Sequence, residues 1–380
     1  MRIGVDASAA FNQGAGIGRY ARHVLSVASK ALPDAAFCLV YAPSRAGTAP
    51  FAHLVREMFP EDANVITKRL PISRRRVDQL WFRARLPVPL EWATGRIDLA
   101  YSPDFTVPPA WRAARVPTIH DLAFEIVPDL TPPRLRAYLG STVPRQIDGA
   151  SLLITVSQTT RKDLEERYHV RPDRIRVVAN GVDRRFFEAV ALDRDTRRQL
   201  ALPDDYLLAV GTIEPRKNLN LLFEALRMAG DIELPLVVAG RQGWQGKQIV
   251  ADAIDLVQAG RIRFLDYVPE QLLPGLYAGA ATLIYPSHYE GFGLPVIEAL
   301  AAGVPVVTST ASAMVEVAGG AAYHADPDDA EDLLQGIRGA LSNSSRSAEV
   351  RQQRQAAARR YDWASAGQAL ASIFDDVCSR

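Results

Sequence analysis

Two glutamates enclose a glycine loop in the C-terminal half of this chain. The segment is Glu290-Gly-Phe-Gly-Leu-Pro-Val-Ile-Glu298, and it follows an apolar run that ends at Tyr285. Gly291 and Gly293 allow unusual backbone torsions and the close approach of a ligand, while Pro295 suits the first turn of a helix. The pattern predicts a strand, a glycine loop and a helix, and the N–H groups at the start of that helix would bind phosphate oxygens.

The position of Glu298 on the predicted helix suggests that it faces a ligand. At about 100° per residue it lies roughly 200° around the helix from Val296, away from the apolar stripe of Val296, Ala299 and Leu300. We therefore expect its carboxylate to meet a ligand. Taken alone, each glutamate also has a plainer interpretation, Glu290 as a solvated loop residue and Glu298 as a favourable charge near a helix N-terminus.

A pair of basic residues follows another apolar run, in the segment Val210-Gly-Thr-Ile-Glu-Pro-Arg-Lys-Asn218. The segment leaves a predicted strand and opens a predicted helix. Arg216 offers planar bidentate donors and Lys217 a compact positive charge, and both suit a diphosphate. Adjacent basic residues at a helix start also occur on ordinary solvated surfaces, and that alternative stays open.

The N-terminal half has two further candidate ligand-binding segments. Gly14-Ala-Gly-Ile-Gly18 lies between a predicted strand and a predicted helix, but its G-x-G-x-G spacing differs from the G-x-G-x-x-G dinucleotide fingerprint, so NAD binding is not predicted. His120 and Asp121 stand at the end of the predicted strand 116–120, at the carboxyl edge where open α/β sheets bind ligands. A single histidine at this edge can equally be a hydrogen-bonded structural residue.

A scaffold of alternating strands and helices must position these segments. Such alternation is typical of βαβ units with parallel sheets, and 380 residues exceed what one core usually supports. The pattern starts again after Arg184, so we expect an α/β protein with two Rossmann-like doubly wound halves. The predicted strands are 2–6, 36–42, 116–120, 152–156, 206–210, 234–239, 262–264, 281–285 and 304–307, and the predicted helices include 17–31, 330–341 and 363–377.

Charge and cysteine content narrow the class of protein. The 44 basic and 43 acidic side chains leave a formal charge of +1, which gives no general attraction to nucleic acid. Cys38 and Cys378 are far apart in the sequence and suggest neither a disulfide framework nor a zinc site. Asp6 interrupts the region where a signal peptide would be apolar, and we expect a cytoplasmic protein, at most peripheral on the inner face of the cell membrane.

The Glu-x7-Glu motif with its GFGLP core resembles family 4 of the retaining glycosyltransferases, and the resemblance spans nearly the whole chain. It implies the GT-B fold, with the active site in the cleft between two domains. The N-terminal, acceptor-binding domain would comprise residues 1–185 plus 362–380, and the C-terminal, nucleotide-sugar-binding domain residues 186–361. The last helix is assigned to the first domain by this analogy.

The resemblance also implies roles for individual residues. In the family the first glutamate, here Glu290, approaches the donor sugar, and the second, here Glu298, hydrogen-bonds the nucleotide ribose. Many relatives carry an arginine where this chain has Thr212, which leaves open whether Arg216 replaces it. The expected catalytic residues are Glu290, His120, Lys217 and Arg216, and the expected donor-binding residues are Gly16, Ile17, Gly211, Thr212, Val268, Gly291, Phe292, Gly293, Leu294 and Glu298.

The implied reaction is retaining transfer of a hexose by front-face attack, without a metal or a cofactor. GDP-mannose is the favoured donor, because Ile-His-Asp-Leu and Gly-Thr-x-x-Pro-Arg-Lys-Asn resemble mannosyltransferase branches; UDP-sugars remain an alternative. The expected acceptor is a glycan or a polyprenyl-linked molecule, whose identity the sequence does not specify. Two other hypotheses are a GT-B sugar-nucleotide epimerase and a non-catalytic sugar-binding protein, although the latter would normally be exported.

Two surface segments have competing interpretations. Asp326-Pro-Asp-Asp329 has an Asp-x-Asp spacing that binds Mn²⁺ in another transferase fold, but it precedes a predicted helix, so we expect capping. Residues 68–86 are either a basic amphipathic stretch that contacts an anionic membrane or a surface helix with core aromatics. The basic residues of this stretch are Lys68, Arg69, Arg74, Arg75, Arg76, Arg83 and Arg85, and the apolar ones are Leu80, Trp81, Phe82 and Leu86.

Overall fold

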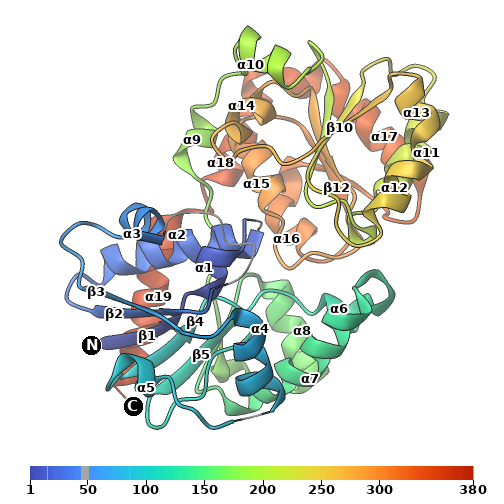
Figure 1. The fold of residues 1–380 in the computed structure, drawn as a ribbon. Coiled ribbons are helices and arrows are strands. Elements are labelled where there is room, and N and C mark those ends of the chain that lie inside the picture. The colour runs from blue at the N-terminus through green and yellow to red at the C-terminus, as the bar shows by residue number, and fades with distance from the viewer. Residues whose placement is uncertain (15, 44–50, 85, 380) are drawn as a thin grey trace. The chain divides into compact units, whose positions relative to one another are not determined.

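The structure is a computed structural model that describes residues 1–14, 16–43, 51–84 and 86–379. The chain divides into two compact units, each built on a parallel sheet with helices packed against it (Figure 1). The N-terminal unit comprises Met1–Leu122, Ala137–Gly181 and Asp362–Arg380, and the C-terminal unit Ala123–Arg136 and Val182–Tyr361. The predicted α/β class with two Rossmann-like halves is confirmed.

The N-terminal unit has a seven-stranded sheet in the order β3-β2-β1-β4-β5-β6-β7. Its strands are near-continuous apolar runs because a parallel sheet is covered on both faces. Their bounds are β1 (Arg2–Asp6), β2 (Ala36–Tyr41), β3 (Val65–Arg69), β4 (Leu99–Ser102), β5 (Ala114–Ile119), β6 (Leu153–Thr155) and β7 (Ile175–Val177). The helices are α1 (Ser8–Asn12), α2 (Gly16–Ala31), α3 (Phe51–Met58), α4 (Arg74–Val77), the π-helical η1 (Asp78–Arg83), α5 (Glu91–Thr94), α7 (Pro133–Gly149), α8 (Gln158–Tyr168), the 3-10 helix η3 (Pro172–Arg174) and α19 (Trp363–Cys378).

Helix α19 belongs to this unit although it follows the whole C-terminal unit in the sequence. It packs along α2 and near β4. Phe374 of α19 is fully buried, and its ring meets the Tyr101 ring with centroids 5.1 Å apart. A Cβ atom at Gly367 would lie 2.8 Å from the Val27 carbonyl oxygen, so the two helices approach closely only because residue 367 is glycine.

The C-terminal unit has a six-stranded sheet in the order β10-β9-β8-β11-β12-β13. The strands are β8 (Leu207–Val210), β9 (Leu236–Ala239), β10 (Ile262–Leu265), β11 (Thr282–Tyr285), β12 (Val306–Ser309) and β13 (Tyr323–Ala325). The helices are α6 (Ala123–Ile126), η2 (Pro128–Leu130), α9 (Arg184–Phe187), α10 (Arg194–Gln199), η4 (Pro215–Lys217), α11 (Leu219–Met228), α12 (Gly246–Asp252), α13 (Ile254–Gln258), α14 (Leu273–Ala278), α15 (Leu294–Ala301), α16 (Ala313–Ala318), η5 (Gly319–Ala321), α17 (Ala330–Leu341), η6 (Ser344–Arg346) and α18 (Ala348–Ala358). Strand β8 pairs with both β9 and β11. The strands before β11 are added on one side of β8 and the later ones on the other side, so the strand order reverses at β8. This point is where open α/β sheets bind ligands at their carboxyl edge.

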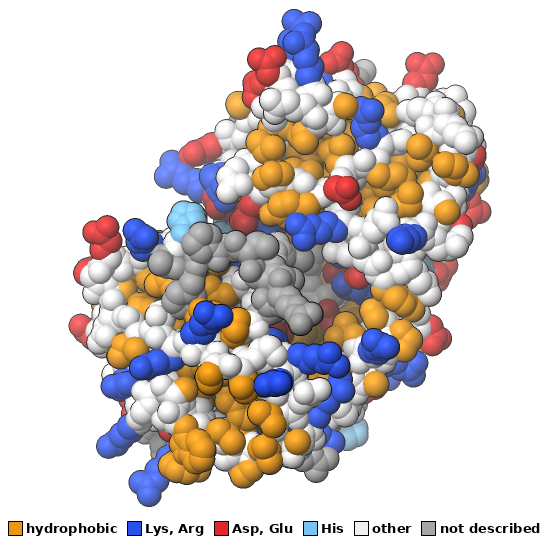
Figure 2. Space-filling view, in the orientation of Figure 1, with side chains coloured by type: hydrophobic (Ala, Val, Ile, Leu, Met, Phe, Trp, Pro, Cys, Tyr) orange, Lys and Arg blue, Asp and Glu red, His pale blue; other side chains and the backbone are white. Residues whose placement is uncertain are grey.

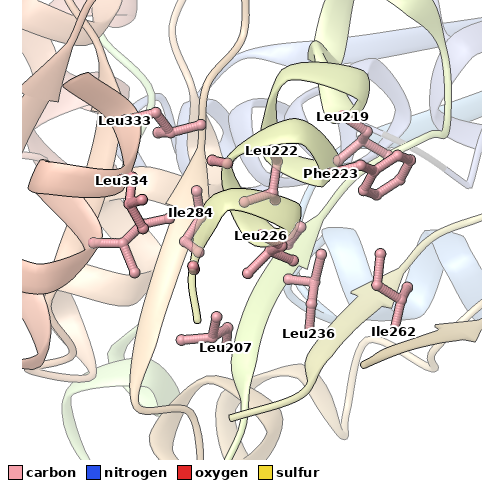
Figure 3. Close-up of a cluster of buried hydrophobic side chains, with 14 of the residues drawn as sticks. Leu207, Leu219, Leu222, Phe223, Leu226, Leu236, Ile262, Ile284, Leu333 and Leu334 are labelled. Carbon is pink, nitrogen blue, oxygen red and sulfur yellow. The ribbon is translucent and has the colours of Figure 1, made fainter. Parts of the chain in front are cut away.

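A hydrophobic cluster holds α11 and α17 to one face of this sheet (Figure 3). Leu222 and Leu226 of α11 and Leu333 of α17 are fully buried with Leu207 and Ile284 of the strands. Loss of a buried leucine side chain typically costs about 2–5 kcal/mol. The loops that follow β8 and β11 therefore rest on a firmly packed base.

Two terminal-region predictions have different outcomes. Asp329 caps α17 by accepting hydrogen bonds from the N–H groups of Glu331 and Asp332, so the capping interpretation is confirmed. The polar stretch 342–360, for which no helix was predicted, contains α18, capped by Ser347. The apolar stripe of α18 is weak, because its buried residues are only Arg354 and Ala358, and residues with high helix propensity favour the helix instead.

Within the described residues, we find no helix long and apolar enough to cross a membrane.

The basic stretch 68–86 is only partly a solvated surface. Phe82 is buried in the N-terminal unit, in agreement with the core-aromatic alternative. Arg74 turns inward, with Nη1 2.9 Å from Asp6 Oδ2 and Nε 2.9 Å from Asp78 Oδ1. Arg74 is thus committed to carboxylates of its own unit rather than to an external partner, and Arg85 lies outside the described residues.

Candidate active site

The loop after β8 presents the predicted basic pair. Gly211 has φ of +141°, a conformation that favours glycine, and the 3-10 turn η4 then carries Arg216 and Lys217. Asn218 adopts the left-handed conformation and begins α11. Its side-chain amide donates hydrogen bonds to the Pro286 carbonyl at 3.1 Å and the Pro327 carbonyl at 2.7 Å. These bonds fix the basic loop against the loops that follow β11 and β13.

The loop after β11 brings Glu290 to the same place. The Glu290 N–H donates to the Ser312 hydroxyl at 2.8 Å, which fixes the backbone of the loop. The Glu290 carboxylate accepts from Lys217 Nζ at 2.6 Å through Oε1 and from Arg216 Nη1 at 2.9 Å through Oε2. Three of the four predicted catalytic residues therefore form one cluster at the carboxyl edge of the C-terminal sheet.

Burial and charge act against each other in this cluster. Only 9% of the Glu290 side chain and 13% of the Lys217 side chain are exposed. Burial alone would raise the pKa of Glu290, but the charges of Arg216 and Lys217 outweigh it and lower that pKa to about 2. Burial alone would lower the pKa of Lys217, and the charges of Glu290 and Tyr285 instead raise it. All three charges are thus kept at neutral pH.

Arg216 is directed toward protein acceptors. Besides Glu290, its guanidinium donates to the Tyr289 carbonyl at 3.0 Å and to Glu214 Oε1 at 3.0 Å. A guanidinium engaged in this way orients Glu290, and a phosphate ligand would have to compete with two carboxylates for it. The sequence hypothesis that Arg216 replaces the arginine missing at Thr212 gains no support from this arrangement.

Lys217 borders a small pocket in the C-terminal unit. Gly211, Thr212, Lys217, Tyr285 and Pro286 are among the residues that line it. Lys217 Nζ donates to the Tyr285 hydroxyl at 2.6 Å and lies 4.8 Å from the centre of the Tyr285 ring. Two predicted donor-binding residues, Gly211 and Thr212, therefore share a pocket with the predicted catalytic lysine.

Helix α15 begins directly after the glycine loop. Gly293 is its N-cap with φ of +97°, a conformation that favours glycine, and a Cβ atom there would also overlap the end of the Met314 side chain. Gly291 precedes it without a positive φ value, in contrast to the expectation for both glycines. Phe292 is buried and meets Tyr361 edge to face at 5.4 Å, while Leu294 starts the helix and is half-buried.

Glu298 lies inside the C-terminal unit. The expectation that Glu298 lies on a side of α15 away from buried side chains is not met, because every residue from Val296 to Ala301 is buried. The reason is that α15 packs against α14, α16 and α18 as well as the sheet, which leaves it no solvent-facing side. The contact of Glu298 with a ligand stays a prediction. Glu298 is 2% exposed, and its Oε2 accepts a hydrogen bond from the Tyr277 hydroxyl at 2.9 Å.

The remaining predicted residues are distributed over both units. In the C-terminal unit, Val268 is buried in the loop after β10. In the N-terminal unit, His120 follows β5 and is 8% exposed, and its Nε2–H donates to the Pro103 carbonyl at 2.9 Å. Gly16 and Ile17 open α2, where Gly16 is exposed and Ile17 is half-buried. The hydrogen bond fixes the His120 ring, so its other nitrogen has a defined direction.

Four contributors to the C-terminal cluster were not predicted. Glu214 lies two residues before Arg216, so a carboxylate beside the basic pair was an available signal, and Tyr285 ends the apolar run that precedes Glu290. Tyr277 and Ser312 lie on other elements, 21 and 22 residues from their partners Glu298 and Glu290, and nothing in the sequence marks them. No group of three or more His, Cys, Asp or Glu side chains that could hold a metal ion occurs among the described residues.

Models of glycosyltransferase families match both halves of the chain. The model for glycosyl transferases group 1 matches residues 193–361, and the model for glycosyltransferase family 4 matches residues 16–186. Together they cover nearly the whole chain, with one match on each half. The chain belongs to family 4 of the glycosyltransferases, with a group 1 domain as its C-terminal half.

Relatives with curated names include mannosyltransferases. O-antigen chain mannosyltransferase B of Escherichia coli is 35% identical over 251 residues, which cover 64% of this chain and 65% of that protein. O-antigen chain mannosyltransferase RfbU of Salmonella typhimurium is 28% identical over 221 residues, which cover 58% of this chain and 59% of that protein. The chain thus spans less than two thirds of the length of each of these relatives.

Solved structures share the fold of the whole chain. HepE from Anabaena, crystallised in complex with UDP and glucose, has a TM-score of 0.72 at 19% identity and covers 98% of this chain and 99% of its own. Sucrose-phosphate synthase from Thermosynechococcus elongatus has a TM-score of 0.76 at 16% identity, with 100% and 99% covered. These likenesses concern the fold, and the expected GT-B class is confirmed by them.

Proposed function

We propose that this protein is a retaining, metal-independent hexosyltransferase that takes its sugar from a nucleoside diphosphate, with GDP-mannose as the favoured donor. The observation that carries the proposal is the cluster of Lys217 and Glu290 at the start of α15, beside the pocket at Gly211. A buried cation and a helix N-terminus suit a leaving diphosphate. The acceptor is a glycan or a polyprenyl-linked glycan.

In the proposed reaction, the acceptor hydroxyl attacks the anomeric carbon on the same face from which the nucleoside diphosphate departs. A carbon–oxygen bond to the acceptor forms, the bond to the diphosphate breaks, and the hydroxyl proton passes to a donor phosphate oxygen. Lys217 and the N–H groups at the start of α15 stabilise the charge that gathers on the diphosphate. His120 is assigned to the positioning of the donor hexose.

Glu290 and Arg216 form a functional pair in this proposal. Glu290 orients the donor sugar, and Arg216 orients Glu290 through its bond to Oε2. When a donor binds, its phosphates compete with Glu290 for Lys217, so the carboxylate exchanges one cation for sugar hydroxyls while Arg216 still holds it. The bond between Arg216 and Glu290 supports this assignment.

Glu298 is proposed to accept a hydrogen bond from the donor ribose. Its Oε2 is oriented by the Tyr277 hydroxyl, which donates to it at 2.9 Å. Because the group is buried, binding requires no further desolvation of the carboxylate by the protein. Tyr277 is thus a positioning residue for the ribose site.

The donor assignment is supported by the relatives named as mannosyltransferases, and the UDP alternative by the complex of HepE with UDP and glucose. A panel of GDP-mannose, UDP-glucose and other nucleotide sugars tests it. Thermal stabilisation and slow donor hydrolysis should be greatest with GDP-mannose. Preferential stabilisation by a UDP-sugar would change the donor while leaving the reaction class intact.

A sugar-nucleotide epimerase with the same fold is the second candidate. It would also bind a diphosphate beside Lys217, so binding data do not separate it from a transferase. Product analysis without an acceptor does, because an epimerase changes the sugar and leaves the nucleotide attached.

We also propose that the protein is cytoplasmic and contacts the inner face of the cell membrane peripherally. The basic stretch 68–86 was one candidate for this contact. Since Arg74 is bonded to Asp6 and Asp78, other side chains of the N-terminal unit must carry it.

A further inference from the structure

Two tryptophans of the N-terminal unit lie side by side on its surface. Trp92 of α5 and Trp111 are 69% and 68% exposed, and their rings meet edge to face with centroids 6.3 Å apart. Large aromatic rings contribute most of their free energy when water is removed from them, so adjacent exposed indoles indicate a surface that another molecule covers.

The backbone beneath the pair is fixed. Glu91 Oε1 accepts hydrogen bonds from the N–H groups of Trp111 at 2.9 Å and Arg112 at 3.4 Å. The N–H of Leu90, which is fully buried, donates to the Pro109 carbonyl at 2.8 Å. The two indoles are therefore presented on an ordered base, and little conformational entropy would be lost when they are covered.

Further apolar side chains lie over the same part of the core. Trp81 of η1 packs on the cluster that also holds Ala93 and Ala110, the chain neighbours of the two tryptophans. Leu80, beside Trp81, is 37% exposed, and its carbonyl accepts from the N–H of Leu86, which is 42% exposed. We call the surface formed by these exposed side chains the tryptophan face; it comprises Leu80, Leu86, Trp92 and Trp111.

The segment that carries the tryptophan face is rich in positive charge. Between residues 65 and 115 the sequence has ten basic and four acidic side chains, although the formal charge of the whole chain is only +1. Figure 2 shows hydrophobic side chains gathered on the lower part of the N-terminal unit, near α5, with Lys and Arg side chains around them. The exposed basic residues of this segment in the described part of the chain are Lys68, Arg69, Arg75, Arg76, Arg83, Arg96 and Arg112.

We propose that the tryptophan face docks on the surface of an anionic lipid bilayer. Indoles concentrate at the boundary between lipid headgroups and acyl chains, where the ring is apolar and its N–H is hydrated. Arginines around them attract anionic headgroups while their stems cover apolar surface. A neutral glycan stacked on the indoles would give the surrounding arginines no role. The inference specifies the surface for the proposed membrane contact and does not depend on the transferase reaction.

Sedimentation with lipid vesicles tests the proposal, using the full chain without nucleotide sugar. Wild type should bind vesicles of phosphatidylcholine with phosphatidylglycerol. The double variant Trp92→Ser/Trp111→Ser should bind the same vesicles at least about ten-fold more weakly. The matched control Val190→Ser/Ile254→Ser changes side chains of the C-terminal unit that are 79% and 55% exposed and should bind like wild type. Equal binding by the tryptophan variant and wild type would overturn the proposal, as would an equal loss in the control.

Charge is tested separately with Arg96→Gln/Arg112→Gln against Arg194→Gln/Lys247→Gln in the C-terminal unit. The first pair should weaken binding several-fold at low salt, and the second should not. Binding of wild type to pure phosphatidylcholine as tight as to the anionic vesicles would contradict the anionic partner. Circular dichroism and thermal unfolding of each variant establish that the fold is intact, since every substituted side chain is exposed.

Discussion

The Arg216 guanidinium holds the Glu290 carboxylate, with Nη1 2.9 Å from Oε2, although 74 residues separate the two in the sequence. The bond joins the loops that follow β8 and β11, two neighbouring strands. Lys217 holds the other oxygen of the same carboxylate. Arg216 and Lys217 thus bind the same carboxylate. In the proposed reaction they have different roles once a donor diphosphate binds.

Arg216→Gln and Lys217→Gln should separate these tasks. If Arg216 positions Glu290, its substitution should lower kcat and change the affinity for free nucleoside diphosphate only a few-fold. Lys217→Gln removes a charge-assisted bond to the diphosphate and should weaken that affinity about ten- to a hundred-fold. Calorimetric titration with steady-state kinetics measures both. Equal losses of nucleotide affinity in the two variants would make Arg216 a phosphate ligand instead.

The two glutamates should also differ. Glu298→Ala should raise the donor KM and weaken binding of free nucleoside diphosphate by about ten- to a hundred-fold, because the ribose is unchanged during the reaction. Glu290→Ala should lower kcat, since it acts on the reacting sugar. Tyr277→Phe is the positioning test for Glu298 and should shift nucleotide affinity in the same direction but less. Normal nucleotide binding by Glu298→Ala would refute the ribose assignment.

The depressed pKa of Glu290 predicts how acid affects stability. A carboxyl whose pKa is lower in the folded protein stabilises the fold above its unfolded pKa, near 4.5, and loses that contribution as pH falls toward about 2. The unfolding free energies of wild type and Glu290→Gln should therefore converge by at most about 3 kcal/mol between these values. Denaturant titrations of both proteins across this range measure it. A constant difference would mean that the carboxylate is not stabilised by its cations.

Gly293→Ala should damage the start of α15. Alanine at φ of +97° is strained, and its Cβ would collide with the end of the Met314 side chain. We expect a loss of about 1–3 kcal/mol in stability together with weaker nucleoside diphosphate binding. Gly320→Ala is the matched control, because no atom lies within 4 Å of its Cβ position. Thermal unfolding measures the stability of the two variants, and calorimetry measures their affinity for nucleoside diphosphate. If Gly293→Ala behaves like the control, the glycine loop is not part of the binding site.

Transferase activity should persist in excess EDTA. The proposal assigns charge neutralisation to Lys217 and the α15 N-terminus, which a chelator does not remove. Product formation is measured with and without EDTA, and then after addition of Mn²⁺ or Mg²⁺. If EDTA abolishes activity and either ion restores it, a metal ion rather than Lys217 neutralises the diphosphate charge.

The strands that carry the site were predictable because each is a short, continuous apolar run. The prediction 281–285 for β11 differs from the structure by a single residue at its start. The proximity of Lys217 and Glu290 follows from topology, since loops at the carboxyl ends of neighbouring parallel strands meet. Their pairing does not follow, because a sequence pattern cannot tell whether a cation faces a carboxylate of the protein or an anionic ligand.

The burial of Glu298 was not predicted from the sequence, and its cause is tertiary. Helical periodicity predicts a helix with one buried side and one solvated side. Helix α15 instead packs against α14, α16 and α18 as well as the sheet. The weak periodicity of α18 had left residues 342–360 without a predicted helix. A helix missed at one place in the chain thus left the burial of another helix unpredicted.

The position of α19 in the chain imposes an order on synthesis. The side of α2 that α19 covers, where His23 stacks on Trp363 and Val27 lies beside Gly367, emerges from the ribosome early, but α19 is translated only after residue 361. The C-terminal unit, nearly continuous from Val182 to Tyr361, is complete before that moment. A nascent chain therefore carries an uncovered α2 through most of its translation, and this helix is where a ribosome-associated chaperone would be needed.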